Sequence, residues 1–229
     1  PGGWHIWIGS IVTALLEAAS RGASYIYGGS NMGSSFLGNG SKYFDRLYAT
    51  RYHGKCGNYW QEIFSDAGIP LVMPLMGCSE ILTMKACLMC FSPDDIIYCS
   101  RNKGRQCNVC SKCFRKQSIL SENVDLAIDL NRYNTPVIEE HLSKFPVYFG
   151  HIYASLIAMG WSPPLFSSKF FAHFPRDCNF SYSYNPECIE LFPKEIRDDI
   201  SKILQLNFNP MSDIQLRMLK DWDQSKMKA

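Results

Sequence analysis

The chain has 229 residues, of which 46% are hydrophobic and 19% are charged. This is an ordinary globular composition, large enough for one large domain or two small ones. The formal net charge of only +2 excludes a general electrostatic argument for nucleic acid or membrane binding, so any such argument has to rest on a local stretch.

The most apolar windows, residues 4–19 and 147–161, are too short to span a bilayer and contain a Glu or a His. We therefore expect no membrane association. The chain has ten cysteines, and four of them cluster while the others are scattered. A disulfide-linked secreted protein spreads its cysteines as a framework. The pattern favours a reducing compartment and predicts a cytoplasmic protein.

In chain order, residues 4–20 carry a broad apolar helical face, and Gly22 is a natural stop for that helix. Residues 23–27 read as a short buried strand that ends at Gly28 and Gly29. A mainly helical stretch over residues 43–67 leads to a second extended run at 69–75 and a helix over 79–90. This order is typical of a parallel α/β sheet, with the Gly/Ser/Asn-rich loop 30–40 at the carboxyl end of a strand, where ligands bind.

After residue 120 the pattern is helical. A helix start is expected at Ser121, and further helices over 135–145, 147–161, 194–206 and 212–222, with an irregular stretch at 166–186. The sequence therefore predicts an α/β portion over residues 1–120 and an α-helical extension over residues 121–229.

The segment from Cys99 to Cys113 carries the strongest chemical signal. Cys99 is followed by seven residues and then by Cys107, Cys110 and Cys113 in a Cys-x2-Cys-x2-Cys run. Two Cys-x2-Cys turns that share a cysteine place three thiolates around a small volume, and Cys99 can supply the fourth corner of a tetrahedron. This spacing predicts a structural Zn2+ site with four cysteine ligands.

Two alternatives remain open for the cysteines. The run also begins an iron–sulfur motif, although the fourth cysteine of that motif should follow three residues later. Disulfides or buried thiols are the other alternative. The cysteines are accompanied by six basic residues and no acid: Arg101, Lys103, Arg105, Lys112, Arg115 and Lys116. This positive charge stabilises thiolates and can bind phosphates. A solvated charged surface would explain these residues as well.

Gly28, Gly29, Ser30 and Asn31 follow the first strand and are candidates for binding a substrate phosphate through backbone N–H groups, and a plain flexible turn is the alternative. No catalytic residue is identified. The loop is not a Walker loop, because no Gly-Lys-Ser/Thr sequence ends it.

Taken together, residues 1–120 resemble the C-terminal half of the 7-cyano-7-deazaguanine synthases of queuosine biosynthesis. The matching pieces, in the same order, are the Pro1-Gly2 helix start, the strand that ends at Gly28-Gly29, the Pro74-Leu75 pair and the zinc knot over residues 99–113. The resemblance implies a Rossmann-like fold of the PP-loop ATP-pyrophosphatase type (adenine nucleotide alpha-hydrolase-like). In that family the phosphate-binding loop lies upstream of this stretch.

The resemblance also implies a function. The protein would be a C–N bond-forming ligase that uses ATP with Mg2+ to adenylate the carboxylate of a deazaguanine-like substrate, followed by amidation or nitrile formation. A homodimer is possible. The alternative is a non-catalytic zinc-containing module that binds nucleic acid or a protein partner through its basic knot.

Overall fold

The computed structural model describes residues 3–29, 31–33, 63–96, 106–123, 129–139, 150–172 and 179–222. The helices in these ranges include α1 (Gly3–Ser20), α4 (Glu80–Cys90), α5 (Ser111–Asn123), α7 (Gly150–Ala158), α8 (Leu165–Phe171), α9 (Lys194–Asn207) and α10 (Asp213–Asp221). The strands are β1 (Ile26–Tyr27) and β2 (Leu71–Val72), and the short 3-10 helices are η3 (Pro93–Asp95), η4 (Leu130–Tyr133), η5 (Phe180–Tyr182) and η6 (Pro186–Leu191).

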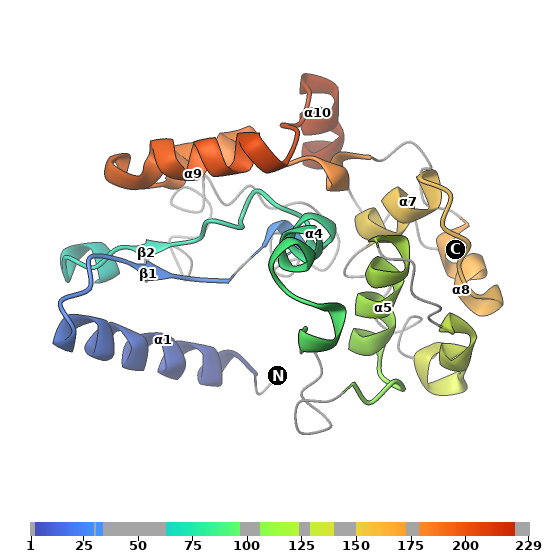
Figure 1. Ribbon diagram of the computed structural model, residues 1–229. Coiled ribbons are helices and arrows are strands. Elements are labelled where there is room, and N and C mark those ends of the chain that lie inside the picture. The colour runs from blue at the N-terminus through green and yellow to red at the C-terminus, as the bar shows by residue number, and fades with distance from the viewer. Residues whose placement is uncertain are drawn as a thin grey trace.

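The two strands form a small parallel sheet, in which Ile26 pairs with Leu71 and Tyr27 with Val72. Figure 1 shows the sheet between α1 on one side and α9 on the other. The predicted Rossmann-like parallel sheet is wrong, because the described residues are mostly helical and only these two strands pair in a sheet. The strand positions were read correctly, but nothing else in the described ranges extends the sheet.

Several helices begin where their capping residues predict. The Ser79 side chain accepts hydrogen bonds from the backbone N–H groups of Ile81 and Leu82 at the start of α4. Ser212 and Gln215 form a capping box at the start of α10. The predicted helix start at Ser121 is wrong, because Ser121 lies inside α5. The stretch 166–186 is also more regular than expected, since α8 and η5 occupy parts of it.

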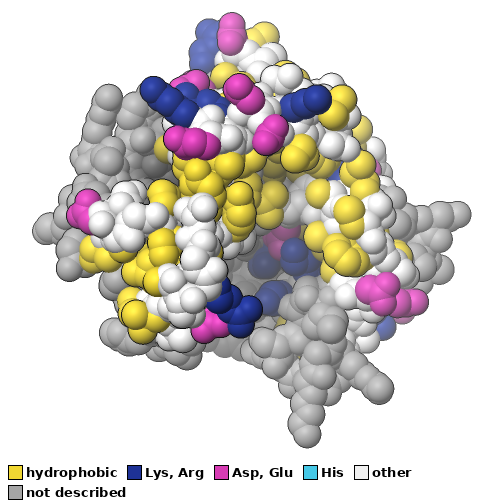
Figure 2. Space-filling view, turned by 60° about the vertical axis from the view of Figure 1, so that its left-hand side comes forward, with side chains coloured by type: hydrophobic (Ala, Val, Ile, Leu, Met, Phe, Trp, Pro, Cys, Tyr) yellow, Lys and Arg dark blue, Asp and Glu magenta, His cyan; other side chains and the backbone are white. Residues whose placement is uncertain are grey.

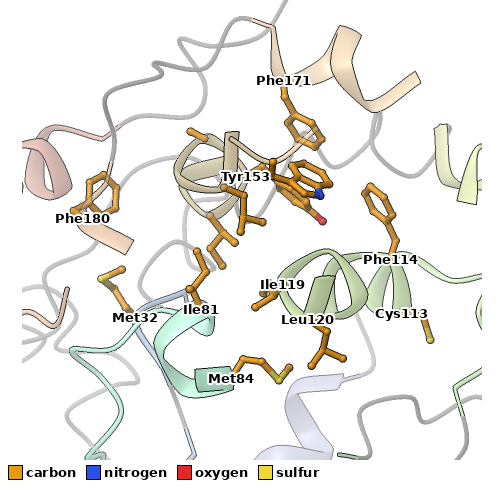
Figure 3. Packing of buried hydrophobic residues seen from close by; sticks show 14 of the residues in the cluster. Met32, Ile81, Met84, Cys113, Phe114, Ile119, Leu120, Tyr153, Phe171 and Phe180 are labelled. Carbon is orange, nitrogen blue, oxygen red and sulfur yellow. The ribbon is translucent and has the colours of Figure 1, made fainter. Parts of the chain in front are cut away.

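The largest hydrophobic core gathers side chains from most of the described chain, including Met32, Ile81 of α4, Phe114 of α5, Tyr153 of α7 and Leu219 of α10. Figure 3 shows the aromatic part of this core. The predicted division after residue 120 falls within α5, and residues from both sides of it share this core.

A smaller core holds α9 over the sheet. Val72 of β2 is buried with Cys188 and Phe192, and Ile196 and Ile200 of α9 pack against them. Figure 2 shows charged side chains along the top of the molecule, where α9 lies, with a band of hydrophobic side chains beneath them. Among the described residues, none of the helices combines the length and the hydrophobicity that a membrane-spanning segment needs.

Candidate metal centre

Cys107, Cys110 and Cys113 converge where a short loop enters α5. Their sulfur atoms all lie within 4.8 Å of one another, and the Sγ atoms of Cys107 and Cys113 are 3.7 Å apart. Cys113 lies in the first turn of α5, and its backbone N–H donates to Cys110 Sγ at 3.4 Å. The turn between Cys107 and Cys110 is tight because Asn108 has a left-handed conformation, with φ of 58°.

These distances have a chemical meaning. Four thiolates around Zn2+ with bonds of about 2.3 Å stand ~3.8 Å apart in a tetrahedron. The separation of 3.7 Å between Cys107 and Cys113 matches that value, and it is far longer than the ~2.05 Å of a disulfide. The three cysteines could therefore bind a metal ion such as zinc. Cys99, the predicted fourth ligand, lies outside the described residues.

The cluster is buried on its protein side and open on the other. Cys110 and Cys113 are buried, whereas Cys107 is half-buried. Val109, between two of the cysteines, is 58% exposed, and Lys112 is exposed as well. Figure 3 shows Phe114 directed toward Tyr153 and Phe171, while Cys113 points away from them. The first turn of α5 therefore presents a sulfur on one side and a core aromatic ring on the other.

A polar network holds the cysteine turn against the rest of the protein. Asn108 Oδ1 accepts a hydrogen bond of 2.8 Å from Gln117 Nε2, one helical turn beyond Cys113. Gln117 Oε1 in turn accepts from the Tyr133 hydroxyl at 2.8 Å and from Arg132 of η4 at 2.7 Å. The network therefore fixes the turn between Cys107 and Cys110 against α5 and η4.

The strongest electrostatic feature beside the cluster is a buried charge group. Glu80, in the first turn of α4, forms ion pairs with Arg115 Nε at 2.7 Å and with Lys116 Nζ at 2.6 Å, both from α5. The side chain of Glu80 is only 4% exposed. Burial alone would raise the pKa of its carboxyl, but the two cations more than compensate and hold the pKa below its ordinary value.

This group changes the interpretation of the basic stretch. Two of its six cations, Arg115 and Lys116, neutralise Glu80 and dock α5 on α4. The only signal for this group in the sequence is an acid directly after a helix-capping serine, and no periodicity links residue 80 to residues 115 and 116. Arg101, Lys103 and Arg105 lie outside the described residues.

His151 of α7 is a core residue. It is fully buried, stacks on Phe180 at 5.8 Å between ring centroids and meets Trp222 edge-on. Burial lowers the pKa of its imidazole to about 3, despite the opposing effect of the Glu80 carboxylate. The imidazole is therefore neutral at physiological pH.

The predicted substrate loop has a structural explanation at its first glycine. A Cβ on Gly28 would lie 2.6 Å from Met73 Sδ, so glycine lets the ends of the two strands approach closely. Gly29 has open space around it, and Asn31 is half-buried. Ser30 lies outside the described residues. The structure therefore places Gly28, Gly29 and Asn31 near the strand ends but adds no support for phosphate binding by them.

The comparisons with known proteins give one match. Residues 59–223, most of the chain, match the model of a protein family described as a family of unknown function (DUF6395). This range includes Glu80 and all four predicted metal ligands. No curated protein matches the chain, and no solved structure does.

Proposed function

Since the chain belongs to the DUF6395 family, whose function is unknown, we propose a function from the site itself: a zinc-stabilised binding module whose basic cysteine knot binds the phosphate backbone of a nucleic acid. The observation that carries the proposal is the convergence of Cys107, Cys110 and Cys113 within 4.8 Å, inside a stretch that has basic residues and no acid.

The sulfur geometry favours zinc over the alternatives. In a four-iron cluster each cysteine binds a different iron atom, which holds the sulfurs farther apart than around a single metal ion. The separation of 3.7 Å suits a mononuclear tetrahedral site, with Cys99 as the fourth ligand. A site closed by four thiolates has no open position for water, so its role is to stabilise the fold rather than to catalyse.

The charges around the knot favour a polyanionic partner. Glu80 compensates one of the two charges of Arg115 and Lys116, so the proposal assigns partner binding to the other four cations of the stretch: Arg101, Lys103, Arg105 and Lys112. Lys112 is exposed, and so is the apolar side chain of Val109, three residues before it in the chain. A cation beside an apolar group can contact a phosphate and the adjacent base together.

Salt-dependent binding tests the proposal. Four phosphate contacts predict a slope of about −3 for the logarithm of the affinity against the logarithm of salt concentration on single strands. The triple variant Arg101→Gln, Lys103→Gln and Arg105→Gln should reduce the magnitude of the slope by about 2. Fluorescence anisotropy with a labelled oligonucleotide measures both values, and zinc content should equal that of the parent protein.

The matched control removes three exposed lysines elsewhere, Lys169, Lys194 and Lys202 of α8 and α9. It carries the same change in net charge and should keep the parental slope. Absence of binding by zinc-loaded protein, or equal losses in the two triple variants, would refute the nucleic-acid proposal.

A second candidate is the ATP-dependent ligase. This candidate rests on the resemblance of residues 1–120 to the 7-cyano-7-deazaguanine synthases and not on the sheet, because only two strands pair among the described residues. An upstream phosphate-binding loop would have to supply the ATP site, with Mg2+. Production of AMP from ATP by the full-length protein, dependent on 7-carboxy-7-deazaguanine and ammonia, would support this candidate. No AMP from zinc-loaded full-length protein would exclude it.

A further inference from the structure

A surface pocket of about 580 Å³ lies away from the cysteine cluster, between α4, the end of α5, η5 and the segment that joins α9 to α10. This volume falls within the ~300–1,000 Å³ typical of small-molecule sites. Its apolar wall consists of Leu82, Leu88, Met89 and Phe208. Its polar residues are Lys85, Glu122, Tyr182, Asn207 and Asn209.

Two opposite charges line this pocket. Lys85 of α4 and Glu122 of α5 both line it, but they form no ion pair within 4 Å, a statement that covers the part of the chain the structure describes. The Lys85 ammonium instead lies 4.8 Å from the centroid of the Tyr182 ring. A cation held on an aromatic face keeps its N–H donors available for a ligand.

The surroundings of these groups are partly dehydrated. Burial raises the pKa of the Glu122 carboxyl, while the Lys85 ammonium opposes the rise. The hydroxyl of Tyr182 is buried and, among the described residues, has no hydrogen-bond partner. Burial, followed by the Glu122 charge, raises the pKa of that hydroxyl. A ligand that brings its own charges would offer partners to these groups, which lack close ones among the described residues.

We propose that this pocket binds a small zwitterion with an apolar body, of the class of α-amino acids with hydrophobic side chains. The ligand carboxylate pairs with Lys85, its ammonium group with Glu122, and its side chain packs against Leu82, Leu88 and Phe208. A zwitterion fits better than an anion or a cation alone, because each of those would leave one pocket charge without a partner. The proposal is independent of the function of the cysteine knot.

The test is calorimetric titration of the zinc-loaded full chain with L-leucine, L-methionine and L-phenylalanine. At least one should bind saturably. For the ligand that binds, the analogue without the amino group and the analogue without the carboxylate should each bind about ten-fold more weakly or worse, because each loses a charge-assisted hydrogen bond. For L-leucine these analogues are 4-methylpentanoate and 3-methylbutylamine.

Variants locate the site. Lys85→Gln and Glu122→Gln should each weaken binding about ten-fold or more. The controls Lys202→Gln and Glu139→Gln replace exposed charges outside the pocket and should bind like the parent. Saturable binding by none of the three amino acids, equal binding of the truncated analogues, or equal binding by the pocket variants would each overturn the proposal. If a pocket variant fails to fold, the titrations of the parent protein with the analogues still decide it.

Discussion

Replacing Glu80 by Gln tests whether the buried charge group holds α5 in place. The variant keeps the size of the side chain but leaves Arg115 and Lys116, whose side chains are 20% and 18% exposed, without their counter-charge. Removing one partner of a buried ion pair costs about 3–5 kcal/mol, because the remaining charge stays poorly solvated. We expect a loss near the lower end, ~3 kcal/mol, since glutamine still accepts hydrogen bonds.

Urea unfolding at pH 7 measures this loss. The carboxylate contributes fully at that pH, because its lowered pKa means that its contribution disappears only as the pH falls through the folded-state value. The midpoint should fall while the slope with urea stays constant. For a chain of this length ~3 kcal/mol corresponds to a drop in melting temperature of roughly 10 °C.

The matched control is Glu187→Gln. Glu187 pairs with Lys220 Nζ at 2.7 Å, but the two side chains are 35% and 39% exposed, so this pair is worth ~1 kcal/mol or less. If Glu80→Gln and Glu187→Gln lower stability by the same small amount, the buried pair does not dock α5. A loss of zinc by Glu80→Gln alone would show in addition that the ion pairs support the cysteine geometry.

Three further predictions follow from the buried parts of the structure. Cys110→Ser, or removal of zinc by a chelator, should lower the melting temperature strongly and reduce helix content, because metal binding at a structural site contributes to the folding free energy; equal melting curves would contradict a structural role. Below pH 6.5 the imidazole of His151 takes up a proton in the unfolded chain but not in the folded one, so the free energy of unfolding should fall by up to ~1.4 kcal/mol per pH unit. His151→Phe should flatten this pH dependence, as measured by urea unfolding between pH 7 and pH 5. Gly77→Ala should lower the free energy of unfolding by ~1–3 kcal/mol, because the new Cβ would lie 2.2 Å from Cys188 Sγ. The control Gly29→Ala has open space around its Cβ, so its melting temperature should stay within about 1–2 °C of the parent's.

The local features of the fold were predictable from the sequence. Helical periodicity and capping serines located α4, α9 and α10 to within a residue or two, because both signals depend on neighbours in sequence. The convergence of three cysteines was predictable for the same reason. The number of strands in the sheet was not predictable from the sequence, because two short extended segments do not indicate how many further strands pair with them.

The long-range parts of the site were not predictable either. Glu80 meets Arg115 and Lys116 across more than thirty residues, and only the packing of α4 on α5 brings them together. The glycine at position 28 led to the prediction of a ligand loop, because glycines often follow strands at ligand sites. In the structure, the side chain of Met73 occupies the space that a Cβ at Gly28 would need.

The cysteine cluster and the strand pairing join residues at very different distances along the chain, and this difference sets an order of folding. The sulfurs of Cys107, Cys110 and Cys113 come together by closing only a short loop, whereas the pairing of Ile26 with Leu71 closes a much longer one. Short closures cost less entropy and occur earlier. We therefore expect metal uptake to nucleate α5 first, so that the rate of refolding rises with zinc concentration, and the two strands to pair last.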